Sequence, residues 1–190
     1  MNRREMLEGV TLMVGGALSA STISGIVSGF QVAEADTSAP QTLTPAQHEL
    51  VATVAELIIP TTDTPGGRAA GVNRFIDGML TSIYTEAERK HFLVGLADLE
   101  ARAQARGAGL PKSGLEALVQ ILKELEAEAV AARAANSADK SFFHELKALT
   151  LLGYYRSEIG ATQEQRYLLI PGYYKGDVPF KEVGRTWSRP

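Results

Sequence analysis

The chain has 190 residues, of which 45% are hydrophobic and 22% are charged, and it contains no cysteine. These fractions are those of an ordinary globular protein, and the net charge of −3 gives no basic face for binding nucleic acid. The lack of cysteine excludes a disulfide framework, a thiolate zinc site, an iron–sulfur cluster and a covalently attached c-type haem on this chain.

The N-terminal segment, residues 1–35, is predicted to be an export signal. Arg3 and Arg4 precede a stretch, residues 9–30, in which half of the residues are apolar and the others are Gly, Ser or Thr. This stretch is less apolar than a permanent membrane span, and a small-residue cleavage site follows at residues 33–35. The arginine pair resembles a twin-arginine signal, which exports folded proteins. A Sec signal and a retained membrane anchor are the alternatives.

The rest of the chain is predicted to have three parts. Residues 36–42 are small and polar and form a linker, residues 43–170 form a helical domain, and residues 171–190 form a tail. Hydrophobic residues in the domain recur at helical spacing, and no period-two run lies between hairpin turns. We therefore expect an all-α fold, a compact bundle of about five helices with an extended, aromatic C-terminal tail.

The individual helices are predicted from their caps and apolar stripes. Thr44-Pro45-Ala46-Gln47 is a capping box with proline in the first turn, and Pro60 ends the helix that follows. Thr85-Glu86-Ala87-Glu88 is a second capping box. We expect helices near residues 44–59, 72–83, 86–106, 115–130 and 139–158. Their buried stripes are expected to be Leu50, Val51, Val54, Leu57 and Ile58; Val72, Phe75, Ile76, Met79 and Leu80; Phe92, Leu93, Leu96 and Leu99; Leu115, Leu118, Val119, Leu122, Leu125 and Val130; and Phe142, Phe143, Leu146, Leu149, Leu152 and Tyr155.

The sequence contains no motif that indicates catalysis or cofactor binding. The glycines of residues 66–71 do not have the spacing of a dinucleotide-binding loop. Glu88 and His91 form one Glu-x-x-His pair, whereas a di-iron bundle requires two such pairs and further glutamates. An enzyme that uses acid–base residues such as His48 or Glu158 is a further alternative, although no nucleophile elbow is present.

Two stretches carry more information than composition and periodicity. The first runs from Ile59 to Asp77 and begins Ile-Pro-Thr-Thr-Asp-Thr-Pro-Gly. The second runs from Phe142 to Gly160 and ends Gly-Tyr-Tyr-Arg-Ser-Glu-Ile-Gly. In this order, after an arginine-pair signal and before a Pro-Gly-Tyr tail, they resemble the gluconate 2-dehydrogenase subunit 3 family. The resemblance covers about Leu43 to Phe180.

The resemblance implies a non-catalytic small subunit of a periplasmic dehydrogenase complex. Its catalytic partner would be an FAD-dependent flavoprotein of the glucose–methanol–choline (GMC) type that oxidises gluconate, another sugar or a glycoside. A c-type cytochrome subunit would take the electrons, so that haem c or an iron–sulfur cluster would lie in other parts of the complex. The small subunit, without a cofactor of its own, would stabilise the flavoprotein and escort it through the twin-arginine translocase.

A free-standing periplasmic helical binding or adaptor protein is the alternative from another functional class. It predicts a stable monomer without an exposed aromatic patch. An accessory subunit, in contrast, needs a surface for its partner.

Candidate partner contacts lie in the loop after the first helix, at the end of the last long helix and in the tail. Asp63 can accept hydrogen bonds from the loop backbone, and Pro65 fixes one φ angle. Tyrosine side chains offer the large, rigid contact area that interfaces favour, and tail aromatics are costly to leave in water. The internal alternative is that the loop caps the first helix, the tyrosines fill the core and the tail packs on the bundle. The candidates are Thr62, Asp63, Pro65, Gly66, Tyr154, Tyr155, Ser157, Glu158, Tyr173, Tyr174 and Trp187.

Overall fold

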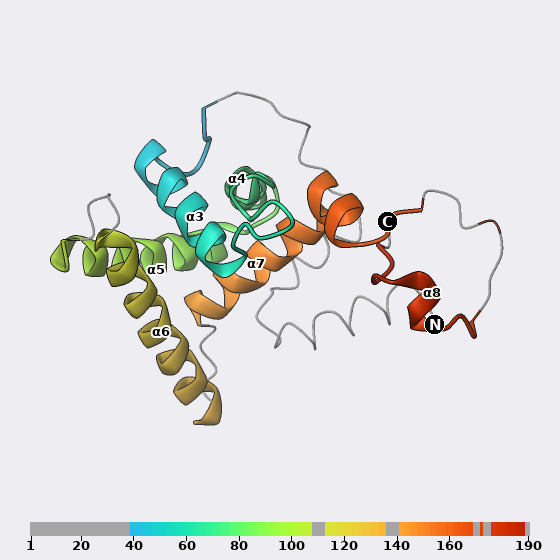
Figure 1. Ribbon diagram of the computed structural model, residues 1–190. Helices are drawn as coiled ribbons and strands as arrows, with labels where there is room; N and C mark the ends of the chain where they lie inside the picture. Colours follow the sequence, from blue (N-terminus) through green and yellow to red (C-terminus); the bar gives the residue numbers. More distant parts are fainter. Residues whose placement is uncertain (1–38, 108–112, 136–140, 169–171, 173–175, 189–190) are drawn as a thin grey trace.

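The structure is a computed structural model of the chain (Figure 1). It describes residues 39–107, 113–135, 141–168, 172 and 176–188. The predicted signal segment, with Arg3 and Arg4, therefore lies outside the described residues, as do Tyr173 and Tyr174. Within the described residues the fold is all-α, without strands, so the predicted fold class is confirmed. None of the helices described has both the length and the apolar composition that a membrane crossing requires.

Five long helices form the bundle, and α7 lies at its centre. α7 contacts α3, α4, α5 and α6, and a π-helical turn, η1, follows it (Figure 1). A short helix, α8, lies near the C-terminus. The helices are α3 (Pro45–Ile58), α4 (Val72–Ser82), α5 (Glu86–Ala105), α6 (Ser113–Ala134), α7 (Phe142–Arg156), η1 (Gly160–Glu164) and α8 (Phe180–Val183).

Local sequence signals determine where several helices begin. The Thr44 hydroxyl accepts a hydrogen bond from the Gln47 N–H at 3.2 Å, and the Gln47 side chain accepts one from the Thr44 N–H at 3.1 Å. Thr85 and Glu88 form the second capping box in the same way. α4 instead begins after Gly71, whose φ of +70° suits a residue without a side chain. Both predicted capping boxes are thus confirmed.

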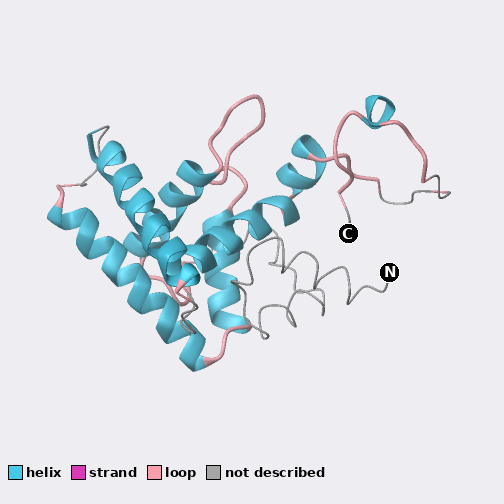
Figure 2. Ribbon diagram, turned by 90° about the horizontal axis from the view of Figure 1, so that it is seen from below, coloured by secondary structure: helices cyan, strands magenta, loops and turns pink. Residues whose placement is uncertain are grey.

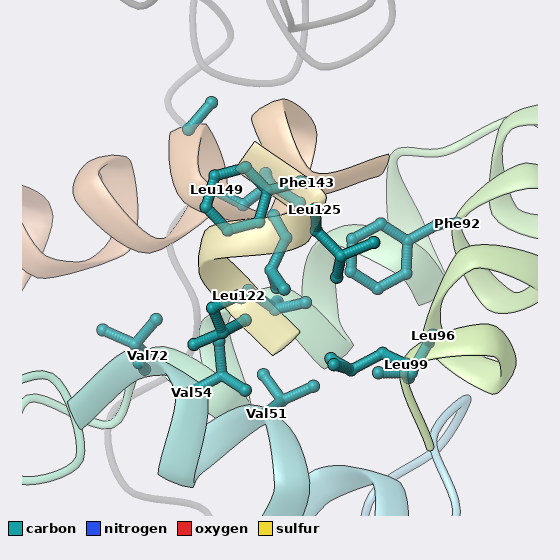
Figure 3. Close-up of a cluster of buried hydrophobic side chains, with 14 of the residues drawn as sticks. Val51, Val54, Val72, Phe92, Leu96, Leu99, Leu122, Leu125, Phe143 and Leu149 are labelled. Atoms are coloured by element: carbon teal, nitrogen blue, oxygen red, sulfur yellow. The ribbon is translucent and has the colours of Figure 1, made fainter. Parts of the chain in front are cut away.

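The core lies where the five long helices converge (Figure 3). The labelled side chains come from all five helices and point toward one another. Phe92 and Phe142 pack edge to face with their ring centroids 5.1 Å apart, which is a favoured aromatic geometry. The largest fully buried side chains are Tyr154, Phe92, Ile76, Met79, Leu80, Leu96, Leu99, Ile121, Leu146, Leu149, Val51 and Val54.

Three residues of the predicted stripes are exposed. Leu115 and Val130 of α6 are 40% and 57% exposed. Val130 follows Ala129, the last buried residue of α6, and one residue rotates a side chain by about 100° around a helix. In α7, Tyr155 is 42% exposed and Tyr154 is 1% exposed, so the stripe prediction chose the wrong tyrosine as the buried one.

The C-terminal tail is not extended throughout. Its described residues include α8, a turn of helix, and the chain then returns to Arg166. The Arg166 N–H donates to the Thr186 carbonyl at 2.8 Å, and the Ser188 N–H donates to the Arg166 carbonyl at 2.9 Å. α8 stands apart from the five long helices in both views (Figures 1 and 2). The tail is therefore folded back on itself rather than packed against the bundle through α8.

Asp77 fixes the segment that precedes α3. Its side chain lies on α4 with 7% of the residue exposed, and its carboxylate accepts three backbone hydrogen bonds. The donors are the N–H groups of Gln41 at 2.8 Å, Thr42 at 3.0 Å and Leu43 at 2.8 Å. The last residues of the predicted linker, residues 36–42, are thus attached to the bundle, and Leu43 is part of the core.

Replacing Asp77 by alanine should destabilise the fold. We expect the free energy of unfolding to fall by about 2–3 kcal/mol, because three backbone donors lose a charged acceptor in a largely buried place. Urea denaturation measures the change. Asp98→Ala is the matched control, since it removes a carboxylate that is paired with Arg102 at 2.9 Å and is half exposed on α5. The control should cost less than about 1 kcal/mol, and equal losses in both variants would contradict this role of Asp77.

Candidate partner interface

Glu56, in the last turn of α3, organises the loop between α3 and α4, residues 59–71. One carboxylate oxygen accepts hydrogen bonds from the Thr61 N–H at 2.9 Å and the Thr61 hydroxyl at 2.7 Å. The other oxygen accepts from the Arg68 N–H at 3.1 Å. A single side chain therefore holds both sides of the loop against the helix from which the loop emerges.

The same hydrogen bonds keep the Glu56 carboxylate ionised. Burial by itself would raise the pKa of Glu56, but the bonds from Thr61 and Arg68 and the positive charge of Arg68 outweigh burial and hold the pKa below its ordinary value of 4.5. The Arg68 guanidinium in turn donates to Glu49 at 2.8 Å and to the Thr53 hydroxyl at 2.7 Å, both on α3. At neutral pH the charged side chains of Glu56 and Arg68 therefore hold the loop against α3.

α7 and η1 hold the loop from the other side. The buried Tyr154 hydroxyl donates to the Pro65 carbonyl at 2.9 Å. The Thr64 hydroxyl donates to the Glu164 carboxylate at 3.0 Å. The two stretches that carry the family resemblance, far apart in the sequence, are therefore in direct contact.

The end of α7 requires residues without side chains at two close approaches. A Cβ on Gly153 would lie 2.8 Å from the Phe75 ring, and one on Gly160 would overlap the Tyr154 carbonyl. The Ser157 hydroxyl donates to the Tyr154 carbonyl at 2.6 Å and accepts from the Gly160 N–H at 3.0 Å. These contacts connect the end of α7 to η1.

The predicted contact residues lie at different depths. Thr62, Asp63, Tyr155, Glu158 and Trp187 are exposed. Pro65 and Ser157 are half-buried, and Gly66 and Tyr154 are buried. Gly66 packs against the Glu56 carboxylate and Tyr154 fills the core, so these two residues have the internal role that the sequence left open. A partner contact by the exposed residues remains a prediction.

The C-terminal arm, a name we use for the described residues among 165–188 (165–168, 172 and 176–188), carries three of the four exposed Phe, Tyr and Trp residues in the described part of the chain. The arm is closed by Arg166, whose guanidinium carbon lies 4.6 Å from the Trp187 ring centroid in a cation–π contact. Tyr167, Phe180 and Trp187 of the arm are 42%, 71% and 40% exposed. Sequence reasoning named Trp187 and included Phe180 among the tail aromatics without listing it as a contact. It missed Tyr167, which precedes the predicted tail of residues 171–190.

Charged residues connect the loop to the base of the arm. The Thr62 hydroxyl, which donates to Asp63 at 3.0 Å, holds the pKa of Asp63 below its ordinary value, and the Arg185 guanidinium contributes in the same direction. Arg185 also donates to the Gln163 carbonyl of η1. Hydrogen bonds therefore link the loop to η1, through Thr64 and Glu164, and η1 to the arm, through Gln163 and Arg185.

Histidines and carboxylates of the described residues do not gather into a metal-binding group of three or more. The two residues of the acid–base alternative make local contacts. A His48 ring nitrogen shares a hydrogen bond of 3.2 Å with the Asn73 side chain, which joins α3 to α4. The Glu158 carbonyl accepts from the Thr162 hydroxyl at 2.7 Å. These contacts stabilise the helical scaffold that carries the loop and the arm.

Replacing Glu56 by glutamine should weaken the attachment of the loop to α3 and change how the free energy of unfolding depends on pH. At neutral pH we expect a loss of about 1–2 kcal/mol in unfolding free energy, because an amide cannot accept all three hydrogen bonds. The folded pKa of Glu56 is lowered, so its stabilisation is complete above the ordinary value of 4.5 and is lost as the pH falls through the folded pKa. The difference between wild type and variant should therefore shrink in acid.

Urea denaturation of both proteins from about pH 7 down to about pH 3 checks this expectation. Glu49→Gln is the matched control, because it makes the same change on the same helix but removes only an exposed ion pair with Arg68. A difference between wild type and Glu56→Gln that stays constant over this pH range would contradict the role given to the Glu56 carboxylate.

Comparison with known proteins identifies the family. Residues 45–172, more than half of the chain, match the family model described as gluconate 2-dehydrogenase subunit 3. Comparison with curated proteins and with solved structures gave no match. The matched range includes α3 to η1 and the loop that Glu56 and Tyr154 hold. The chain belongs to the gluconate 2-dehydrogenase subunit 3 family, whose members are accessory subunits of a dehydrogenase complex.

Proposed function

We propose that this chain is the non-catalytic small subunit of a periplasmic FAD-dependent dehydrogenase complex that oxidises gluconate, another sugar or a glycoside. The family match over residues 45–172 is the observation that carries the proposal. The catalytic partner is a GMC-type flavoprotein that holds the FAD, and electrons leave through a c-type cytochrome subunit. Haem c or an iron–sulfur cluster belongs to these other parts of the complex.

The fold supports the role of a stabilising subunit. The loop of residues 59–71 is held from both sides, so its exposed tip is a rigid surface that loses little freedom on binding. A partner that binds only the folded form of a protein stabilises that form by mass action. The small subunit therefore stabilises the flavoprotein by a free energy that grows with the logarithm of its concentration relative to Kd.

The exposed aromatic side chains count against a free-standing adaptor protein, which predicts no such patch. Tyr155, Tyr167, Phe180 and Trp187 are each at least 40% exposed. Three of these four lie in the C-terminal arm, and aromatic side chains are among those that protein interfaces favour. A subunit of a stable complex can bury such side chains against its partner.

The escort part of the proposal requires that the complex is exported in folded form. FAD binds a folded flavoprotein, and a twin-arginine signal directs folded proteins across the membrane. Arg3 and Arg4 supply that signal on this chain. Because the chain has no cysteine, its fold closes without disulfides and can form in the reducing cytoplasm before transport.

Purification with a tag on this chain tests the complex. Co-expressed with the flavoprotein, the tagged chain should elute with a partner of larger mass and with a visible flavin spectrum that dithionite bleaches. The same chain expressed without the flavoprotein should be colourless. A flavoprotein that elutes by itself, fully active and exported in the absence of this chain, would show that the proposed function is wrong.

Replacement of Arg3 and Arg4 by lysine tests the escort. We expect the small subunit and the flavoprotein to accumulate together in the cytoplasm, because the translocase requires the arginine pair. Dehydrogenase activity in the periplasmic and cytoplasmic fractions measures the effect. Arg133→Lys, at an exposed position of α6, is the control and should leave export unchanged. Normal periplasmic activity in the double variant would refute twin-arginine escort while leaving the complex intact.

A further inference from the structure

The C-terminal arm carries exposed apolar side chains that the bundle does not cover. Eight large hydrophobic residues of the described part of the chain are exposed, and four of them lie in the arm. These are Tyr167, Leu168, Phe180 and Trp187, of which Phe180 is the most exposed at 71%. Figures 1 and 2 both show α8, which begins with Phe180, separate from the long helices.

The arm has a defined shape although it lies outside the bundle. The two hydrogen bonds between Arg166 and residues 186–188 join its ends, and the Arg166 side chain stacks on the Trp187 ring. Arg166 also donates to the Val183 carbonyl at 3.4 Å. Arginine, tyrosine and tryptophan are the residues that most often dominate the energy of protein interfaces. A closed arm of this composition is organised before any partner binds it.

The charge of the arm segment is opposite to that of the bundle. Residues 165–188 contain four basic and two acidic residues, whereas residues 43–164 contain twelve basic and sixteen acidic ones. A surface that complements the arm is therefore acidic as well as apolar.

A hollow at the base of the arm shows where an acidic group can bind. It has a volume of about 390 Å³ and is lined by residues of η1, by the segment that follows η1 and by the end of α8. Arg166 and Arg185 both line it, and none of its lining residues is acidic. Within the described part of the chain, neither guanidinium forms an ion pair. Each has five N–H donors and gives one to a backbone carbonyl, so donors remain for a carboxylate.

We propose that the C-terminal arm docks on an acidic, apolar surface of the catalytic subunit. A carboxylate of that subunit enters the hollow between Arg166 and Arg185, and Phe180 with Tyr167 provides the apolar anchor. This inference rests on the proposed function, since it names the surface through which the small subunit binds. The loop is joined to the base of the arm through η1, since Thr64 donates to Glu164 and Arg185 donates to the Gln163 carbonyl.

The catalytic subunit fits the arm better than a lipid surface does. A membrane-surface segment needs a long amphipathic helix, and α8 has four residues. A second copy of this chain would have to offer its net-acidic bundle to the arm, and the sedimentation experiment below distinguishes that occupant. A partner protein with an acidic, apolar groove complements both the charge and the aromatic side chains of the arm.

Phe180→Ala and Arg185→Gln in the full chain test the proposal. With the chain co-expressed and purified in complex, each should weaken binding to the flavoprotein by about ten-fold or more, as measured by surface plasmon resonance of the re-associated subunits. Added salt should weaken the wild-type complex more than the Arg185→Gln complex, because the variant lacks one of the charges that pair with the partner. Thermal unfolding of isolated Phe180→Ala should be unchanged, since this residue is 71% exposed. Arg185→Gln should lower the midpoint only slightly, because it removes one exposed hydrogen bond, the one to the Gln163 carbonyl.

Val94→Ala and Arg133→Gln are the matched controls. Val94 is 63% exposed on α5, and Arg133 is exposed in the last turn of α6. Both should bind like wild type. If the wild-type complex forms and Phe180→Ala and Arg185→Gln bind as tightly as the controls, the arm proposal is wrong and the proposed function stands. If the wild-type chain does not bind the flavoprotein, both are wrong.

Two further outcomes would also overturn the arm proposal. One is that the variants bind the flavoprotein normally but lose binding to vesicles of anionic phospholipid. The other is that the wild-type chain is a dimer by sedimentation and the variants are monomers with normal affinity for the flavoprotein. In both cases the arm would have a different occupant from the one that we infer.

Discussion

The hydrogen bond from the Tyr154 hydroxyl to the Pro65 carbonyl joins the core of this protein to its surface loop. The Tyr154 ring is packed within the bundle, on the helix that contacts the four other long helices. Its hydroxyl reaches the loop that protrudes from the end of α3, 2.9 Å from a backbone oxygen. A buried phenol needs a partner, and a loop needs an anchor, so each satisfies the requirement of the other. The position of the loop is therefore set by the packing of α7.

The Glu56 carboxylate completes this constraint from the opposite side. Tyr154 binds the loop near its middle, while Glu56 binds it at Thr61 and at Arg68. These attachments belong to α3 and α7, which are themselves in contact in the bundle. A change in the packing of either helix would consequently shift the position of the loop tip. A surface built in this way is rigid, which lowers the entropic cost of binding a partner.

Local rules predicted the helices well, because each helix carries its own signals. Capping boxes need only neighbouring residues, and an apolar stripe needs only a constant rotation per residue. The predictions of buried residues were wrong where packing against other parts of the fold determines which side chain is covered. Tyr154 and Tyr155 are adjacent and equally apolar, and Tyr154 is the one that lies on the buried face of α7 and bonds the α3–α4 loop. Val130 continues a sequence pattern beyond the last residue of α6 that the bundle covers.

The candidate site was predictable in part for the same reason. The turn residues of the loop and the aromatic character of the tail can be read from the chain, and both lie on the surface. The Asp77 clamp, the Glu56 anchor and the Arg166–Trp187 contact could not be predicted, because each joins residues that only the tertiary fold brings together. Asp77 and Glu56 look like ordinary helix carboxylates in the sequence. Their acceptor roles depend on backbone N–H groups whose positions no local pattern specifies.

The division between bundle and arm suggests an order of events for an escort protein. Among the described residues, the apolar core lies between Leu43 and Ile159 and includes no residue of the arm. The arm is closed by one stacked pair and two backbone hydrogen bonds, and it leaves Phe180 in water. Such an arm has little to gain from the bundle and much apolar surface to bury elsewhere. If the arm docks as we propose, the folded bundle is present first, and the flavoprotein supplies the surface on which the arm completes its burial.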